Sequence, residues 1–380
     1  MKPGALPGPW ALHLGAQAVQ REDLGQTRQI AEPRGLDFSS NDYLGLRLDP
    51  RLAEAARAAA ERYGSGTGAA RLLRGTSPIH AALEEALAAW KGQEAALLFN
   101  TGYQCNATVI PALAGAGDAI FSDQLNHASI VDGCRMARAC GAHLEVYQHL
   151  DPADLDQRIR AWRQGGGTGQ VLVVSDTVFS MDGDVVYLPA LLKVCQGHEA
   201  LLMVDEAHAT GLLGATGAGV AEWQGVAAQV HLVMGTLGKA LGSFGAFVAC
   251  SGLLRDHLVN TCRGFIFSTA LPAPVVAAAL AGVRLAQGEP HRRKRALAHA
   301  DRLSTALGLS PHPSAIVPVL IGPEREALAQ ALALQEAGFD IRAVRPPTVP
   351  KGTSRLRITT GAHLVNADLT SLLDAMGVEP

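Results

Sequence analysis

The sequence predicts an α/β fold with a mostly parallel sheet covered by helices, followed by a smaller α+β domain at the C-terminal end. Three observations predict this arrangement. Short runs of β-branched residues alternate with longer Ala/Leu-rich helical stretches through the middle of the chain. Several of these runs are apolar throughout, which is typical of strands buried on both faces of a parallel sheet. Past residue 275 the pattern changes to short strands interspersed with helices.

Two helices and six strands are expected before residue 251. One helix runs from Asp49 to Tyr63. The other runs from Pro78 to Trp90, with proline in its first turn and Leu83 and Leu87 along one face. The expected strands are Ala95–Asn100, Ala119–Ser122, Gln170–Ser175, Ala200–Val204, Leu232–Thr236 and Gly245–Cys250.

Domain boundaries are expected near residues 45 and 275. Residues 1–45 form an N-terminal segment, residues 46–275 a large domain and residues 276–380 a small one. We expect the N-terminal segment to pack against the small domain or a partner subunit. After Leu271–Pro274 we expect one long Ala/Leu/Arg helix. Beyond it, two further helices alternate with expected strands at Ala315–Ile321, Ile341–Val344 and Arg355–Thr359.

Composition excludes several classes of function. The 380 residues are 48% hydrophobic and 18% charged, as in an ordinary soluble globular protein. A formal charge of -3 provides no basic surface for nucleic acid or an anionic membrane. No apolar run approaches the ~20 residues of a membrane span, and residues 1–10 lack the apolar core of a signal peptide. The 6 cysteines form no C-x-x-C pair and the 13 histidines show no metal-ligand spacing. We therefore expect a cytoplasmic protein with free thiols and no metal.

Two motifs that follow expected strands carry candidate chemistry. Val204–His208 places Asp205 at the carboxyl end of a buried strand, the edge where open α/β sheets bind ligands. The alternative is that this carboxylate caps the next helix. Thr236–Lys239 places Lys239 just past another strand, between two small residues. Burial would lower its pKa and provide the neutral amine that Schiff-base chemistry needs. The alternative is an exposed lysine in a turn.

Pyridoxal phosphate (PLP) requires a lysine, a carboxylate at the ring nitrogen, a group stacked on the ring and a phosphate cradle. The sequence offers a candidate for each requirement. Lys239 and Asp205 supply the first two. His127 could stack on the ring or simply open a helix. In Phe99–Gln104 a strand, a glycine turn and a helix start could present N–H groups to a phosphate, and Thr236 could add a hydroxyl.

These motifs together resemble the α-oxoamine synthases, a family of fold-type-I PLP enzymes, from about Phe38 to the C-terminus. The resemblance implies a large domain with a mostly parallel seven-stranded sheet and a smaller α+β C-terminal domain. Ala70 departs from the family pattern, which usually has glycine or serine at that position. The matching motifs are Asn41–Leu46, Gly64–Gly68 with Arg71 and Gly75, His80–Glu84, Phe179–Asp184, Val204–His208, Thr236–Lys239 and Phe267–Pro272.

The resemblance implies a role for each matching residue. Lys239 would hold PLP as a Schiff base and act on protons, while Asp205 would keep the ring nitrogen protonated. His127 would stack on the ring, and Ser180 and His208 would contact its phenolic oxygen. Ser268 or Thr269 of one subunit would reach the phosphate in the partner's site, which implies a homodimer. The remaining implied contacts are Gly102, Tyr103 and Thr236 to the cofactor, and Asn41, His127, Thr348 and Arg357 to the substrates.

Within the family, Ser122–Ile130 and Ile341–Arg357 most resemble the members that condense L-alanine with a pimeloyl thioester in biotin synthesis. The resemblance thus implies an acyltransferase whose donor is pimeloyl-CoA or a pimeloyl acyl carrier protein. The alternatives are a synthase that uses glycine and acetyl-CoA, an aminotransferase, or a non-catalytic binding protein. In one departure, the N-terminal arginine that relatives carry near the distal acyl carboxylate has no clean counterpart, since Arg21 does not align with it.

Overall fold

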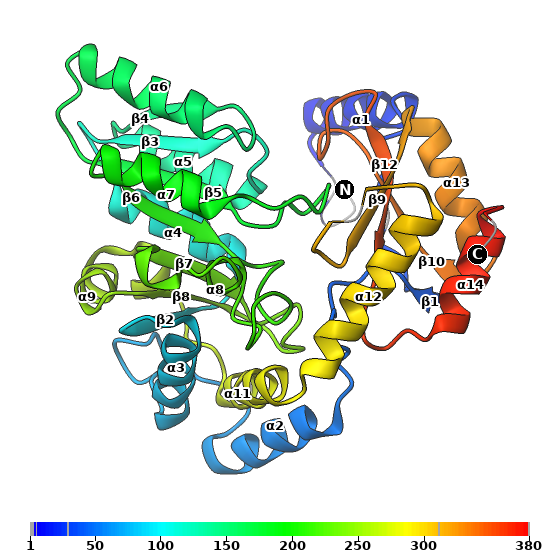
Figure 1. Ribbon diagram of the computed structural model, residues 1–380, viewed down its shortest axis with the longest axis horizontal. Coiled ribbons are helices and arrows are strands. Elements are labelled where there is room, and N and C mark those ends of the chain that lie inside the picture. The colour runs from blue at the N-terminus through cyan, green and yellow to red at the C-terminus, as the bar shows by residue number, and fades with distance from the viewer. Residues whose placement is uncertain (1–3, 5, 29, 311, 379–380) are drawn as a thin grey trace.

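The main layer of the molecule is a seven-stranded sheet (Figure 1). The computed structural model describes residues 4, 6–28, 30–310 and 312–378. The strand order is β2-β8-β7-β6-β5-β3-β4, and all neighbours are parallel except β8, which runs antiparallel to β2 and β7. The mostly parallel seven-stranded sheet is therefore confirmed. Its strands are β2 (Ala95–Phe99), β3 (Ala119–Asp123), β4 (His143–Tyr147), β5 (Val171–Asp176), β6 (Leu201–Asp205), β7 (Leu232–Thr236) and β8 (Ala246–Cys250).

Helices cover both faces of this sheet, and each face has its own hydrophobic core. Successive residues of β5 point to opposite faces, so Val173 packs in one core while Leu172 and Val174 pack in the other. The first core is covered by α3 (Pro78–Lys91), α6 (Pro152–Gln164), α7 (Leu188–Gly197) and α11 (Ala273–Gly288). The second is covered by α4 (Gly102–Leu113), α5 (Ala128–Ala139) and α9 (Gly252–Thr261).

A second, smaller sheet lies to one side of the seven-stranded sheet and its helices (Figure 1). It is antiparallel, with β12 (Ser354–Thr359) between β11 (Arg342–Val344) and β9 (Ile316–Gly322). The short strand β1 (Leu36–Asp37) pairs with β10 (Phe339–Asp340), so the N-terminal segment is tied to this part. The domain boundaries expected near residues 45 and 275 of the chain stay a prediction. The helices here are α12 (Pro290–Ala306), α13 (Glu324–Glu336) and α14 (Asn366–Ala375).

One of the remaining helices, α2 (Pro50–Tyr63), packs against α11 and adds Leu52 to the first core. α2 begins where the Asp49 side chain accepts the Arg51 N–H, with Pro50 fixing the first turn, and it ends at Gly64, whose φ of +83° suits glycine. None of the helices that the structure describes is long and apolar enough to cross a membrane. The full set is completed by α1 (Gly8–Asp23), α2 (Pro50–Tyr63), α8 (Val220–Trp223), α10 (Arg263–Ile266) and a 3₁₀ turn at Ala227–Gln229.

One element differs from its prediction. The single long helix expected after Pro274 is two helices, α11 and α12, which meet at Glu289. Pro290 occupies the first turn of α12, where its missing N–H breaks no helical hydrogen bond. The same residue cannot continue α11, because a helix interior needs that N–H and leaves no room for the ring. The chain turns at this point and enters the smaller part of the molecule (Figure 1).

Candidate active site

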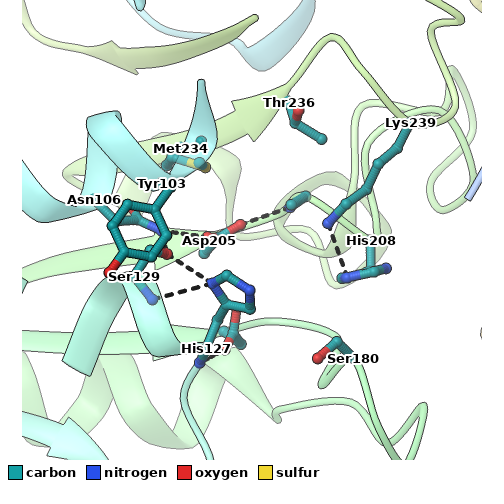
Figure 2. Close-up of a pocket in the computed structure, with 13 residues that line it drawn as sticks. Tyr103, Asn106, His127, Ser129, Ser180, Asp205, His208, Met234, Thr236 and Lys239 are labelled. Atoms are coloured by element: carbon teal, nitrogen blue, oxygen red, sulfur yellow. Dashed lines mark hydrogen bonds between the residues drawn. The ribbon is translucent and has the colours of Figure 1, made fainter. Parts of the chain in front are cut away.

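A cavity of about 190 Å³ lies at the carboxyl edge of the main sheet (Figure 2). Strands β5, β6 and β7 end there in Asp176, Asp205 and Thr236. Carboxyl ends of neighbouring parallel strands meet at one edge, which is why residues far apart in sequence converge. All eight predicted cofactor contacts outside Ser268 and Thr269 line this cavity. The lining comprises Gly102, Tyr103, Asn106, His127, Ser129, Asp176, Ser180, Asp205, Ala207, His208, Met234, Thr236 and Lys239.

Lys239 points into the cavity rather than into solvent (Figure 2). Its Nζ lies 2.9 Å from Nε2 of His208. Burial lowers the pKa of Lys239 to about 8; the carboxylates of Asp205 and Asp176 oppose this shift and the charge of Arg357 adds to it. A substantial fraction of this amine is therefore neutral near pH 7.5, as nucleophilic and base chemistry require.

His208 connects Lys239 to a tyrosine on the other side. Tyr43 Oη lies 2.5 Å from Nδ1 of His208 and donates to Oδ1 of Asn41 at 3.1 Å. A neutral His208 has one ring N–H, so Nδ1 and Nε2 take opposite donor and acceptor roles toward Tyr43 and Lys239. Burial, and then the charges of Lys239 and Arg357, hold the pKa of His208 well below its usual range. The ring is therefore neutral.

Asp205 is buried, with 4% of its surface exposed, and its carboxylate is held from two sides. Asn106 Nδ2 donates to Oδ2 at 2.7 Å, and the backbone N–H of Ala207 donates to Oδ1 at 2.8 Å. The second contact is the kind of turn capping that the sequence left open as an alternative. Close by, burial and the charge of Asp205 raise the pKa of Asp176 well above its usual range. The cavity thus has two acidic groups on one wall.

His127 opens helix α5, as one of the two sequence interpretations expected, and its side chain also lines the cavity; its stacking on the PLP ring stays a prediction. Its Nδ1 accepts the N–H of Ser129 at 3.2 Å, and its own backbone N–H donates to Oδ2 of Asp176 at 2.7 Å. Burial lowers the pKa of His127. The ring is consequently neutral, with its proton on Nε2, and the helix start fixes its orientation.

The predicted phosphate cradle lies at the start of α4. Thr101 caps the helix by accepting the Gln104 N–H at 3.0 Å, and Gly102 is its first residue. A Cβ atom at Gly102 would lie 2.8 Å from Cε of Met234, so glycine leaves this corner open. The hydroxyl of Thr236 donates to the Gly245 carbonyl at 3.0 Å and accepts the Gly238 N–H at 3.3 Å, so its expected contact with a phosphate would require the hydroxyl hydrogen to turn away from Gly245. The first-turn N–H groups of α4 are the donors available to an anion.

Ser268 and Thr269 are not part of this cavity. They line a separate small pocket, where Ser268 Oγ accepts from Gln104 Nε2 and the Thr269 carbonyl accepts from Asn100 Nδ2 at 2.8 Å. Their implied contact with the phosphate of a partner subunit stays a prediction.

Arg357 lies on β12, at the side of the cavity that faces the smaller sheet. Its Nε donates to the Ser180 carbonyl, and Nη2 and Nη1 donate to Asn41 Oδ1 and Thr359 Oγ1, both at 3.1 Å. All three acceptors are neutral, and Arg357 forms no salt bridge with any carboxylate among the residues that the structure describes. A buried guanidinium with an unneutralised charge is suited to a carboxylate ligand.

Thr348 lines a second cavity, of about 540 Å³, that shares Ser180 with the first. The Thr348 hydroxyl accepts from Nη2 of Arg28 at 3.3 Å, so the N-terminal segment reaches this loop. The backbone N–H of Thr348 also donates to the Arg345 carbonyl at 3.1 Å, so this residue helps to form a turn as well as lining the cavity. The lining comprises Gln124, Leu125, Asn126, His149, Phe179, Ser180, Met181, Asp182, Asp184, His312, Thr348, Val349, Pro350, Thr353 and Arg355.

Sequence reasoning missed four polar residues of the site: Tyr43, Asn106, Ser129 and Asp176. Asp176 follows a predicted strand, so the argument that selected Asp205 would have selected it too. Asn106 lies one helical turn beyond Gly102 on α4, on the face that meets the sheet edge. Tyr43 is inside the Asn41–Leu46 motif, but nothing in the sequence indicates that it meets His208, 165 residues away.

Comparison with known proteins places this site in a family. The chain matches the model of aminotransferase class I and II over residues 33–376. A serine palmitoyltransferase from S. paucimobilis, solved with bound PLP-myriocin aldimine, superposes with a TM-score of 0.86 at 31% identity, over 96% of this chain and 95% of that one. Among curated proteins, the 8-amino-7-oxononanoate synthase of Anaeromyxobacter dehalogenans strain 2CP-1 is 50% identical over 93% of this chain and 88% of its own. The 8-amino-7-oxononanoate synthase of Geobacter sulfurreducens is 49% identical over 92% of this chain and 90% of its own. The chain belongs to aminotransferase class I and II and, within it, to the 8-amino-7-oxononanoate synthase family.

Proposed function

We propose that this chain is a PLP-dependent acyltransferase that condenses L-alanine with a pimeloyl thioester, giving 8-amino-7-oxononanoate, carbon dioxide and a free thiol for biotin synthesis. The observation that carries the proposal is one continuous set of contacts. It runs from Lys239 through His208, Tyr43 and Asn41 to Arg357, with Asp205 across the same cavity. A base, a carboxylate and a receptor for the amino-acid carboxyl group are thereby brought together.

The residues of the cavity fit PLP. Asp205 and Asp176 form an acidic wall that suits a protonated pyridine nitrogen. Asn106 Oδ1 is buried and has no hydrogen-bond partner among the described residues, which leaves an acceptor beside that wall. The α4 start supplies anion-binding N–H groups opposite Lys239. When bound, PLP supplies a carbonyl that links to amines and a ring that stabilises a carbanion by accepting its electron pair.

The residues of the chain would then divide the work. Arg357 binds the amino-acid carboxylate, and its planar guanidinium fixes which Cα bond faces Lys239. Lys239 takes the Cα proton as a neutral amine and later returns a proton to the same carbon. Asp205 would hold the ring nitrogen and keep its positive charge. His127 would stack on the ring and exclude water from it. The new carbon–carbon bond forms at the thioester carbonyl, the thiol leaves, and the carboxyl group departs as carbon dioxide.

The second cavity favours a long acyl chain over an acetyl group. It adjoins the first at Ser180, and its lining includes Leu125, Phe179, Met181 and Val349, which suit a row of methylene groups. An acetyl donor would leave this space unused. The relatives named 8-amino-7-oxononanoate synthase point to the same substrate. A homodimer that shares Ser268 or Thr269 across its interface is part of this proposal, as are a cytoplasmic location and an acyl donor carried on CoA or acyl carrier protein.

The test is thiol release by purified protein with PLP, for each pairing of L-alanine, glycine or L-serine with pimeloyl-, acetyl- or palmitoyl-CoA. We expect release only with L-alanine and pimeloyl-CoA, at least tenfold above any other pairing. Preference for glycine and acetyl-CoA, or for L-serine and palmitoyl-CoA, would overturn the substrate assignment. Pimeloyl acyl carrier protein, tested in parallel, identifies the carrier of the acyl chain.

A further inference from the structure

A histidine behind the cavity joins two loops that carry site residues. His149 Nδ1 lies 2.8 Å from Oδ1 of Asp123, and its Nε2 lies 2.6 Å from Oδ2 of Asp184. Asp123 ends β3 and begins the loop that leads to His127. Asp184 closes the loop that contains Ser180. We propose that His149 is a positioning residue whose imidazolium clamps these two loops and fixes the spacing of His127 and Ser180 across the PLP cavity.

Each end of the clamp belongs to a hydrogen-bonded loop. The Asp123 carboxylate also accepts the N–H groups of Leu125 at 2.8 Å and Leu150 at 2.9 Å, so it organises the turn before His127. In the other loop, Phe179 donates its N–H to the Asp184 carbonyl at 3.0 Å, and Gly183 donates back to Phe179 at 2.8 Å. The Asp123 carboxylate is thus fixed by its own loop, whereas the Asp184 carboxylate is held by His149 alone and follows the backbone of a hydrogen-bonded loop.

The geometry requires a charged ring. Both ring nitrogens lie at hydrogen-bond distance from carboxylate oxygens, so both must donate, and only the imidazolium has two N–H groups. Burial by itself would lower the pKa of His149. The hydrogen bonds to Asp123 and Asp184, together with their charges, outweigh burial and raise this pKa to about 9. The His149 ring also packs perpendicular to the Phe179 ring, with ring centroids 4.4 Å apart.

The other charged groups near the clamp line the second cavity, of about 540 Å³, as His149 and Asp184 do. Arg355 donates to Asp182, and His312 lines the cavity beside them. Neither of the clamp's own carboxylates forms an ion pair with an arginine or lysine among the described residues. Deprotonation of His149 would leave two carboxylates and a neutral ring that can donate to one of them. The link between the two loops would then be lost on one side.

The inference rests on the proposed function, because PLP binding is its main readout. We expect His149→Gln to weaken PLP binding about tenfold at pH 7.5, since glutamine can donate to one carboxylate and would present its oxygen to the other. Wild-type affinity should fall by a similar factor as pH rises through about 9, and the variant should lack this alkaline loss. Affinity is measured by the absorbance and fluorescence of bound PLP, beside kcat and KM for L-alanine.

Two further variants make the test specific. His143→Gln is the matched control, because His143 also pairs with a carboxylate, Glu145 at 2.9 Å, but at the sheet edge and not at the cavity. It should leave PLP affinity unchanged. Asp184→Asn should weaken binding as His149→Gln does. The double variant should be no worse than either single one, because all three remove the same link.

Two outcomes would overturn the clamp. One is wild-type PLP affinity and kinetics in His149→Gln with a lowered thermal midpoint, which would make the residue merely structural. The other is a neutral His149 at pH 7.5 in the NMR spectrum of cofactor-free protein with ¹⁵N-labelled histidine. This second measurement needs no PLP. A wild-type chain that does not bind PLP at all would sink the proposed function, while the NMR result would still decide the charge of the clamp.

Discussion

The buried ion pair between Lys91 and Glu206 provides a quantitative test of how the sheet edge is held. Lys91 Nζ donates to Glu206 Oε2 at 2.6 Å and to Thr210 Oγ1 at 2.8 Å, and it also donates to the Ala218 carbonyl. The side chains of the pair are 2% and 0% exposed. Glu206 is the residue after Asp205, so this pair anchors the end of β6 from behind the cavity. Replacing Lys91 with methionine leaves a buried carboxylate without its cation.

The expected loss follows from burial. Breaking a fully buried pair by removing one partner destabilises a protein by about 3–5 kcal/mol. Unfolding entropy near the midpoint is about 2.1 cal/mol/K per residue, or about 0.8 kcal/mol/K for a chain of 380 residues. Lys91→Met should therefore lower the thermal midpoint by about 4–6 °C. The double variant Lys91→Met/Glu206→Gln should recover at least half of the loss, because the uncompensated charge is gone while the amide oxygen still accepts the Ala221 N–H.

Calorimetry and urea unfolding at one fixed protein concentration measure both variants. Lys294→Met is the matched control, since Lys294 is exposed and its loss should move the midpoint by less than about 1 °C. A midpoint for Lys91→Met within 1 °C of wild type would refute the reasoning. So would a double variant that is less stable than the single one, because charge burial would then not be the cause.

Three further predictions concern the cavity. Lys239→Ala should abolish thiol release, and retained turnover above about 1% of wild type would reject the lysine assignment. Arg357→Lys should raise KM for L-alanine by about 10- to 100-fold with a smaller change in KM for pimeloyl-CoA, because lysine cannot reproduce the planar fork. The rate at which the cofactor-free protein captures PLP should rise with pH and level off above about 8, where the lowered pKa makes Lys239 neutral. A rate still rising steeply between pH 9 and 10.5 would show an ordinary lysine.

Buried strands were predictable because their apolar runs are set by burial on both faces. All six predicted strands of the main sheet are present, within about two residues at each end. The seventh strand, His143–Tyr147, was not located in the sequence. Only the total of seven strands was implied, by the family resemblance. This strand lies at the sheet edge, where His143 and Glu145 pair in partly exposed positions, so its alternation is polar and weak. The break at Pro290 was missed because the Ala/Leu/Arg composition continues across it.

The motif-bearing residues were predictable because each follows a strand that ends at the same edge. Lys239, Asp205 and His127 meet in one cavity for this reason. The residues that contact them and set their charge and orientation could not be predicted. Tyr43 and Asn106 reach the site through packing between distant segments, which no local pattern encodes. Such contacts depend on the relative placement of whole helices and loops.

The proposed function is tested most directly by finding which lysine carries PLP. The chain has six lysines, Lys2, Lys91, Lys193, Lys239, Lys294 and Lys351. Borohydride reduction of the PLP-loaded protein, followed by peptide mass spectrometry, reports the site of attachment. We predict one pyridoxyl group per chain, on Lys239, with the modification lost in Lys239→Ala. Attachment at any of the other five lysines, or no attachment in protein that releases thiol, would contradict this assignment.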